Sequence, residues 1–371
     1  MKVLHLVGSQ TSAYYHGVSM MYAPGCIRAL PEMDHIVLLA NLDGTWSVVE
    51  SLEAGVVKDA DRHALPQALM KLHQDSAISC MQPHMFDYKG MVTYRCIADL
   101  LDIPMIGSPG DVMALTTNKW QSRAVVSSAG VPVPEAQLLR RGDDVRMVPP
   151  FIIKPCREDN SMGISLVTES SRIPQALATA FQFDDELICE QFIPLGRELR
   201  VGVVDGEDGR LEFLPVMEYF LHDKVEPIRT SKDKISTSDD GATSMDFAPV
   251  DRRVPATIDR DLYDKLHSLA TKSHVALGCR HYSLYDVRVD PDGNPFFIEA
   301  SPYCSFSPKS ALVTMSRGKQ GYDDTTIFHR LAERAVHEFR KTSVTDADGT
   351  PEKQIMGMRT RNAFQTTNAF Q

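Results

Sequence analysis

Short apolar runs alternate with helical periodicities along the first third of the chain. Apolar residues recur at helical spacing in Ala64–Gln74 and Thr93–Leu101. The runs before, between and after these segments have the length of buried strands, namely Val3–Val7, Ile36–Ala40, Ile78–Met81 and Pro104–Gly107. Strands that alternate with helices are typical of a parallel sheet in an open α/β domain. We therefore predict such a domain over residues 1–112, with ligand-binding loops at 8–11 and 82–84, beyond the carboxyl ends of its strands.

A second pattern, two apolar strands around a polar loop, occupies residues 150–167. Pro150–Pro155 and Ile164–Val167 are the strands, and the loop between them is rich in small and polar residues. Backbone N–H groups and the Ser161 hydroxyl of such a loop can close over phosphates. Lys154 lies at the inner end of the first strand, where its charge would reach the same phosphates. A plain hairpin with a solvated lysine is the alternative.

The pattern of Tyr285–Pro302 predicts a β-hairpin. Asp290-Pro-Asp-Gly-Asn294 supplies the turn, since proline presets one backbone angle and glycine accepts a left-handed one. Alternation places Asp286 with Arg288 and Asp290 on one face, and Phe297, Glu299 and Ser301 on one face of the returning strand. Asp286 and Glu299 then lie close together. Two such carboxylates repel unless a cation lies between them, and hard oxygen ligands suit Mg²⁺. A surface hairpin with solvated acids is the alternative.

The remaining pattern predicts helices over 118–129, 258–277 and 326–341. Lys119 lies in the first turn of the first helix, where a phosphate would offset its unfavourable interaction with the helix dipole. Glu186–Ile193 is an apolar strand that leads into Gly196-Arg-Glu198. The polar stretch 221–251 is long enough to be a lid or a solvated loop. Its cations that could reach a phosphate are Lys224, Arg229, Lys232 and Lys234.

Composition narrows the class of protein. The chain has 371 residues, is 43% hydrophobic and 24% charged, and has a formal charge of −10. These values predict two or three globular domains, and the scattered cations argue against a nucleic-acid partner. We find no apolar run of transmembrane length and no signal-peptide pattern, so we expect a cytoplasmic protein without a membrane partner. The seven scattered cysteines fit reduced thiols, and Cys304 is the one near the hairpin.

Taken together, these stretches resemble the ATP-grasp fold, and in particular the D-alanine–D-alanine ligases. The resemblance covers about residues 1–340. It implies an N-terminal open α/β substrate-binding domain over 1–112, a central ATP-binding lid domain over 113–198 and a C-terminal catalytic domain over 199–341. Residues 342–371, which repeat Asn-Ala-Phe-Gln, are predicted to be a mobile tail without an assigned role.

The resemblance assigns ATP and Mg²⁺ as cofactors and gives roles to particular positions. Lys154, Ser161, Asp286 and Glu299 would be catalytic. Asp286, Glu299 and Ser301 would hold the metal. The nucleotide would be bound by Lys119, Lys154, Ser161, Met162, Gly163, Glu190, Gln191, Phe192, Ile193 and Glu198.

Two positions depart from the pattern of the D-alanine–D-alanine ligases. That family usually carries an arginine two residues before the metal aspartate and an asparagine two residues after the metal glutamate, whereas this chain has Leu284 and Ser301. The arginine stabilises the tetrahedral intermediate formed when an amine attacks an acyl phosphate. Its absence argues against ordinary dipeptide synthesis, and Ser301 leaves the number of bound Mg²⁺ ions open.

A closer resemblance is to the ATP-grasp ligases of mycosporine-like amino acid biosynthesis. It is carried by His5-Leu-Val-Gly-Ser9, Cys279–Asp286 and Glu299–Ser310. It implies a reaction that joins mycosporine-glycine to an amino acid such as serine, threonine or glycine, and gives a shinorine-type ultraviolet screen. The proposed electrophile is a ring ketone activated by phosphorylation. Residues near the hairpin that could bind these substrates are Arg280, His281, Tyr282, Tyr303, Ser305 and Lys309.

Two other interpretations remain open. The chain could be an amino-acid or dipeptide ligase that makes an acyl phosphate, although Leu284 argues against it. It could also be a regulatory protein that binds nucleotide without chemistry, although the retained lysines and metal acids argue against that. The accepted amino acid is not fixed by the sequence, and a homodimer is possible because related ligases are often dimers.

Overall fold

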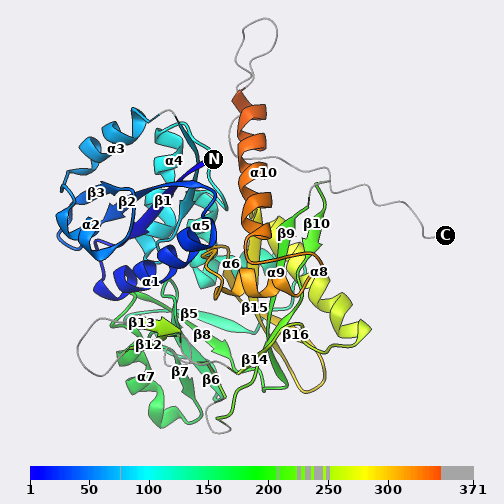
Figure 1. Cartoon of the computed structure of the whole chain (residues 1–371). Helices are drawn as coiled ribbons and strands as arrows, with labels where there is room; N and C mark the ends of the chain where they lie inside the picture. Colours follow the sequence, from blue (N-terminus) through cyan, green and yellow to red (C-terminus); the bar gives the residue numbers. More distant parts are fainter. Residues whose placement is uncertain are drawn as a thin grey trace, which may run out of the picture.

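The computed structural model describes residues 1–75, 77–206, 209–223, 227–229, 235–237, 245–247 and 251–343. In this part of the chain three larger sheets with flanking helices, and a two-stranded fourth sheet, form a mixed α/β architecture (Figure 1). The α/β class expected from the sequence is confirmed. The α-helices are α1 (Ala13–Ala29), α2 (Ala54–Asp59), α3 (Leu65–His73), α4 (Ile97–Leu100), α5 (Gly110–Thr117), α6 (Lys119–Ser128), α7 (Ile173–Ala180), α8 (Arg260–Ala276), α9 (Ala311–Arg317) and α10 (Thr326–Ser343).

The N-terminal sheet has the strand order β3-β2-β1-β4. Its strands are β1 (Lys2–Gly8), β2 (Asp34–Ala40), β3 (Trp46–Val49) and β4 (Ile78–Pro83). β1 pairs in parallel with β2 and β4, which confirms the predicted parallel core, and β3 adds an antiparallel edge that the sequence analysis did not predict. The predicted strand at 104–107 makes only a single bridge, between Met81 and Met105. Pro104 lacks an N–H donor and Gly107 has a φ of +96°, so a longer ladder does not form.

A chain of histidines lies buried in this first sheet. His5 Nε2 lies 2.9 Å from His35 Nδ1, and His5 Nδ1 lies 2.9 Å from His84 Nε2. His35 Nε2 lies 3.0 Å from the Leu30 carbonyl, which can only accept, so His35 donates there and each next histidine donates toward it. Burial lowers the pKa of His84 to about 3, and burial next to two histidines also lowers that of His5. These rings are therefore neutral at pH 7, and His84 is 1% exposed.

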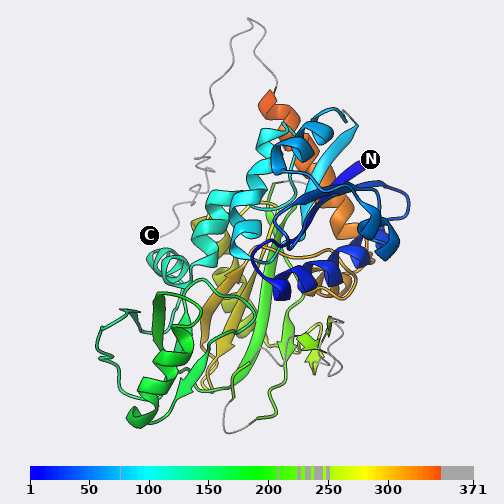
Figure 2. The ribbon, with the colours of Figure 1, turned by 90° about the vertical axis from the view of Figure 1, so that its left-hand side faces the viewer.

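The central sheet has the order β5-β8-β6-β7. Its strands are β5 (Ala136–Arg140), β6 (Phe151–Pro155), β7 (Ser165–Val167) and β8 (Glu186–Gln191). β6 and β7 pair antiparallel, which confirms the predicted hairpin around the polar loop. Helix α7 packs on one face, where Phe151, Leu187 and Ala180 share an apolar core. The other face is turned toward the third sheet (Figure 2).

The C-terminal sheet has the order β14-β11-β9-β15-β16, with β10 paired to β9. Its strands are β9 (Arg197–Asp205), β10 (Leu211–Phe213), β11 (Met217–Tyr219), β14 (Arg252–Arg253), β15 (Tyr282–Val289) and β16 (Pro295–Ser301). Tyr285, Val287 and Phe297 bury one face beneath α8. Asp286 points to the opposite face, and the predicted hairpin is confirmed by the pairing of β15 with β16.

A β-bulge in β16 corrects one detail of the predicted hairpin. Asp286 lies opposite Glu299, as predicted, but Val287 lies opposite Phe297, so Ile298 has no partner residue. The extra residue reverses the alternation. Phe297 therefore packs into the core beneath α8 rather than on the face of Glu299, whereas Ile298 and Glu299 both line a cavity. The prediction that Phe297 and Glu299 share a face was wrong, because strict alternation takes no account of a bulge.

The N-terminal and C-terminal sheets are joined by side chains at the start of β15. Arg280 Nε donates to the Gly107 carbonyl at 2.9 Å, and its Nη2 donates to the Met105 carbonyl at 3.2 Å. The Gly107 N–H donates to His281 Nδ1 at 2.9 Å. Helix α10, orange in Figure 1, lies along the same junction. We call these contacts of Arg280 and His281 the domain clasp.

The stretch predicted as a lid or loop contains a short antiparallel hairpin, β12 (Ile235–Thr237) with β13 (Met245–Phe247). Lys224, Lys232 and Lys234 lie outside the described residues, as does the predicted tail from residue 344 onward. Among the helices described, none is both long and apolar enough to cross a membrane.

Candidate active site

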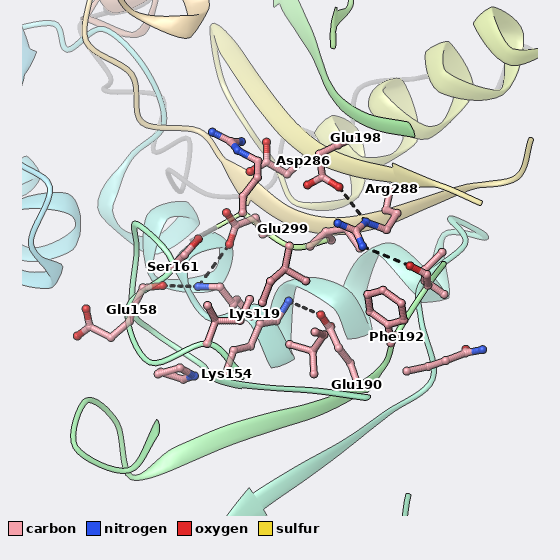
Figure 3. Close-up of a pocket in the computed structure, with 18 of the residues that line it drawn as sticks. Lys119, Lys154, Glu158, Ser161, Glu190, Phe192, Glu198, Asp286, Arg288 and Glu299 are labelled. Carbon is pink, nitrogen blue, oxygen red and sulfur yellow. Dashed lines mark hydrogen bonds and ion pairs between the residues drawn. The ribbon is translucent and has the colours of Figure 1, made fainter. Parts of the chain in front are cut away.

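A cavity of about 780 Å³, open to solvent, lies between the central sheet and the C-terminal sheet (Figure 3). The structure brings most of the predicted nucleotide and metal residues to its walls, namely Lys119, Lys154, Ser161, Met162, Glu190, Gln191, Phe192, Ile193, Glu198, Asp286 and Glu299. Gly163 lies in the adjoining loop, and Ser301 lies at the end of β16, opposite Leu284 and 6% exposed.

Lys154 and Glu190 form a buried ion pair on the floor of the cavity. Lys154 Nζ lies 2.5 Å from Glu190 Oε1, and each side chain is 6% exposed. The two residues sit on the neighbouring strands β6 and β8, with Ile152 opposite Glu190 and Lys154 opposite Ile188. Because each charge is compensated, the pair can remain in a dry site. An ammonium group held in this position can also bind a phosphate oxygen that enters the cavity.

A second ion pair lies at the end of the cavity lined by Phe192. Arg288 Nε donates to Glu198 Oε2 at 2.8 Å, and the guanidinium lies 5.6 Å from the centre of the Phe192 ring. Arg288 also donates to the carbonyl oxygens of Ile193 at 3.3 Å and Pro227 at 2.8 Å. The sequence analysis placed Arg288 on the face of Asp286 but assigned it no role. This end therefore combines an aromatic ring, backbone carbonyls and a carboxylate, which suits a purine and its ribose.

Lys119 connects the first turn of α6 to the metal acids. Its Nζ lies 3.5 Å from Glu299 Oε2 and also donates to the Glu158 carbonyl. Asn118 caps the helix by accepting from the Gln121 N–H at 3.0 Å, which fixes where the lysine leaves the backbone. Figure 3 shows Lys119 between Glu299 and the loop that carries Ser161.

Asp286 is held by an arginine that the sequence analysis did not assign to the site. Arg200 Nε donates to Asp286 Oδ1 at 2.6 Å, and Nη2 donates to Oδ2 at 2.8 Å. The pair joins β9 to β15, since Arg200 lies directly opposite Asp286. Burial disfavours the charge of Arg200, but Asp286 and Tyr219 outweigh this effect and hold its pKa well above the usual value.

The loop between β6 and β7 has a strained backbone beside the cavity. Asn160 has a φ of +54° and Ser161 a φ of +58°, in the left-handed region that non-glycine residues seldom adopt. Gly163, at a φ of +73°, lies where a Cβ would be 2.8 Å from the Phe183 ring. Tyr15, from α1, donates to Glu158 Oε2 at 2.9 Å and so ties the loop to the N-terminal domain.

A smaller cavity of about 240 Å³ adjoins the first and shares Lys119, Glu158 and Glu299 with it. Asp159 and Tyr303 complete this end of the site. Burial raises the pKa of Tyr303 well above its usual value, and Asp159 and Glu299 raise it further, so the phenol stays protonated. The predicted substrate residue Tyr303 thus lies beside Glu299, one of the two predicted metal ligands.

The other predicted substrate residues lie elsewhere. Arg280 and His281 form the domain clasp, and burial lowers the pKa of His281. Tyr282 is fully buried, with its hydroxyl accepting from the Cys304 N–H at 3.0 Å. Ser305 is buried and accepts from the Ser307 N–H, and Lys309 is exposed. Burial also raises the pKa of Cys304 to about 12, which keeps that thiol protonated.

The donor set at the hairpin suits a hard divalent cation. Asp286 and Glu299 present carboxylate oxygens from adjacent strands, and Arg200 contacts the first carboxylate and Lys119 the second. A carboxylate has about four lone-pair positions, so these contacts leave capacity for a metal ion. Oxygen ligands of this kind, with phosphate oxygens and water, are those of Mg²⁺. The residues present therefore fit Mg²⁺ and a nucleotide phosphate chain.

Similarity to known proteins agrees with this geometry. Residues 125–333 match the family described as D-ala D-ala ligase C-terminus. A D-alanine–D-alanine ligase from Citrifermentans bemidjiense is 30% identical over 257 residues, which are 68% of this chain and 77% of that protein. One from Geobacter sulfurreducens is 27% identical over 278 residues, 73% of this chain and 79% of that protein.

Solved structures show the same fold. The VanG D-Ala:D-Ser ligase from Enterococcus faecalis superposes with a TM-score of 0.70 at 20% identity, covering 90% of this chain and 99% of that one. The D-alanine–D-alanine ligase from Coxiella burnetii superposes with a TM-score of 0.71 at 17% identity, covering 92% and 95%. The ATP-grasp architecture expected from the sequence is thereby confirmed.

Proposed function

The chain belongs to the D-alanine–D-alanine ligase family of ATP-grasp enzymes, and from this premise we propose that it joins the amine of an amino acid to a second small molecule at the expense of ATP. Membership makes it an enzyme that forms C–N bonds. The observation that carries the proposal is the meeting of two lysines and two metal acids in one cavity. A nucleotide-binding protein without chemistry would have no need of this complete set.

Each group has a role in the proposed reaction. Lys154 and Lys119 neutralise charge on the phosphates, and the Ser161 loop covers them. Asp286 and Glu299 would hold Mg²⁺, which supplies charge stabilisation to the phosphates when bound. Phe192 and Glu198 would hold the purine and ribose. Most of the catalysis then comes from positioning and electrostatics.

In each of the two steps of the proposed reaction, one bond forms and one bond breaks. An oxygen of the electrophilic substrate attacks the γ-phosphorus, an O–P bond forms, and the bond to the β-phosphate oxygen breaks to release ADP. The amine then attacks the carbon that bears the phosphorylated oxygen. The C–O bond breaks, phosphate leaves, and the amine loses its proton to solvent or to a base. The products are the C–N linked compound, ADP and phosphate.

One candidate electrophile is an amino-acid carboxylate, activated as an acyl phosphate. Similarity supports it, because the relatives named above are D-alanine–D-alanine ligases and one solved relative is a D-Ala:D-Ser ligase. The product would be a dipeptide.

A second candidate electrophile is the ring ketone of mycosporine-glycine, which would give an imine-type mycosporine-like amino acid. It is favoured by Leu284, which stands where the dipeptide ligases usually carry an arginine and is fully buried in the core with Phe306. The tyrosine at 303, beside Glu299, supports a planar substrate, since an aromatic ring can stack on a conjugated one. Serine, threonine and glycine are the amino acids we propose to supply the amine.

ADP release tests the proposal and separates the candidates. The full chain is incubated with Mg·ATP and either D-alanine with D-serine, or mycosporine-glycine with serine, threonine or glycine, while the ultraviolet spectrum is followed. Release that requires mycosporine-glycine and an amino acid, with a red-shifted product, supports the imine ligase. Release with two amino acids and no chromophore supports the dipeptide ligase. ATP binding without release under any pair would refute the proposed activity.

A further inference from the structure

Arg200 is a buried arginine that uses only part of its capacity to donate hydrogen bonds. Two of its nitrogens are occupied by Asp286, through the 2.6 Å and 2.8 Å hydrogen bonds described above. Within the described residues, the third nitrogen, Nη1, has no hydrogen-bond partner. A guanidinium carries five N–H donors in a fixed plane, so three donors remain, two of them on Nη1, on a side chain that is 15% exposed. An open donor pair on a charge held this rigidly is suited to an anion.

The surroundings of Arg200 show where such an anion would lie. Asp286 lines the large cavity. Tyr219 and Cys304 lie close enough to Arg200 to raise its pKa. The guanidinium lies 5.9 Å from the centre of the Tyr219 ring, and Arg229 covers the same ring at 3.7 Å. Tyr22, from α1 in the N-terminal domain, is also within electrostatic range of Arg200. The arginine thus sits where the N-terminal domain, the 303–304 segment and the metal acids meet.

On the neighbouring strand β15, the position two residues before Asp286 is a leucine and offers no such charge. Leu284 lies opposite Gly202, and a Cβ on Gly202 would be 2.3 Å from Leu284 Cδ2. The leucine therefore occupies the space above the glycine and packs into the core with Leu214. On this face of β9 and β15, Arg200 supplies the guanidinium directly opposite Asp286, whereas Arg288, two residues further along β15, is paired with Glu198.

We propose that Arg200 binds the oxygen of the electrophilic substrate that accepts the phosphoryl group, at the carbon that the amine attacks. The inference rests on the proposed ligase activity and adds a substrate-binding residue to it. Nη1 would donate to that oxygen before and during its release with phosphate, while Asp286 holds the other edge of the guanidinium in place. The bidentate contact leaves lone pairs on Asp286, so the same acid can serve a metal ion.

The test compares Arg200→Gln and Arg200→Lys with Arg197→Gln. Arg197 is a matched control on the same strand, because it makes a bidentate pair with Glu218 at 2.7 Å through both Nε and Nη2. Binding of mycosporine-glycine and of D-alanine is measured by equilibrium dialysis with Mg·ADP present, and ADP release is measured separately. Thermal unfolding checks that each variant is folded, and Arg200→Lys keeps the positive charge beside Asp286 if Arg200→Gln does not fold.

We expect Arg200→Gln and Arg200→Lys to weaken binding of the electrophile about tenfold or more and to slow ADP release about 10²-fold, the scale of losing one donor to a developing oxyanion. Mg·ADP affinity should change less than threefold, and Arg197→Gln should behave as the parent. Parent-like electrophile binding in both Arg200 variants, or a loss confined to Mg·ADP, would overturn the inference. Electrophile binding that depends on Arg200 without ADP release in the parent would instead refute the ligase proposal alone.

Discussion

Two of the buried polar clusters in the described residues differ in how their polar groups are compensated. The cavity cluster consists of charges in pairs, Lys154 with Glu190 and Arg200 with Asp286. The histidine chain, His35–His5–His84, consists of rings that donate in one direction, and burial lowers the pKa of His5 and His84 so that these two rings are neutral. Paired charges are costly to bury and are suited to binding a charged ligand, whereas neutral rings fill a core at lower cost. The presence of paired charges therefore distinguishes a cluster that is suited to binding a ligand from one that stabilises the fold.

The largest expected effect concerns the function of the charged cluster. Glu299→Gln should lower turnover by about 10³-fold, the upper range for one electrostatic group of a transition state. The physical reason is that the amide keeps the shape of Glu299 but loses the charge needed for the metal and for Lys119. ADP release measures it, and Glu186→Gln, at an ion pair outside the cavity, is the control. Parent-like turnover in Glu299→Gln would remove this residue from the metal site.

The second prediction concerns the stability of the same cluster. Lys154→Met should lower the free energy of unfolding by about 3–5 kcal/mol, because it leaves the Glu190 carboxylate buried without its partner. Lys154→Met/Glu190→Leu should recover most of this loss, since it removes both charges. Urea unfolding of the two variants measures the difference. Equal stability of the single and double variants would show that the pair is not electrostatically coupled.

The third prediction concerns the histidine chain and is smaller. The folded-state pKa of His84 is depressed to about 3, so below the ordinary value of 6.5 the unfolded chain binds more protons than the folded one. The contribution of His84 to the free energy of unfolding is therefore nearly constant above pH 6.5 and falls as the pH decreases toward 3. At pH 5 the loss from His84 should be about 2 kcal/mol. Urea unfolding at pH 7 and pH 5 measures it, and His84→Gln should reduce the pH dependence while exposed His73→Gln should not.

The smallest effect should come from a charge pair at the surface. Arg141 Nε lies 3.2 Å from Asp185 Oδ1, but the two side chains are 61% and 88% exposed. Arg141→Ala should change the free energy of unfolding by less than about 1 kcal/mol, because water already screens the pair. A larger loss in urea unfolding would mean that pairing itself, rather than burial, distinguishes the cavity cluster from the rest of the protein.

The sequence predicted the parts of the site that depend on local pattern. Alternation and a Pro-Asp-Gly-Asn turn were enough to bring Asp286 opposite Glu299, and a helix start was enough to place Lys119. The pairing of Arg200 with Asp286 was not predictable, because it depends on the register of two strands that are 86 residues apart. The bulge at Ile298 was missed for a related reason, since it is defined by the partner strand.

Long-range contacts also explain where the substrate predictions diverge from the structure. Arg280 and His281 precede the hairpin in sequence and suggested a substrate role, but their side chains meet residues 105–107 of the N-terminal domain. Tyr303, equally close to the hairpin in sequence, lies in the smaller cavity. Distance from the hairpin along the sequence is similar for all three residues, so it could not show which of them reaches the cavity. Their positions depend on how the two domains pack.

The domain clasp has a consequence for how reactants come and go. Arg280 and His281 hold the N-terminal domain through backbone groups at Gly107 and Met105. We therefore expect the N-terminal and C-terminal sheets to move together as one rigid body. The central sheet would then move relative to them. In such an arrangement the rate of the catalytic cycle is set by the rate at which the central sheet opens to release ADP.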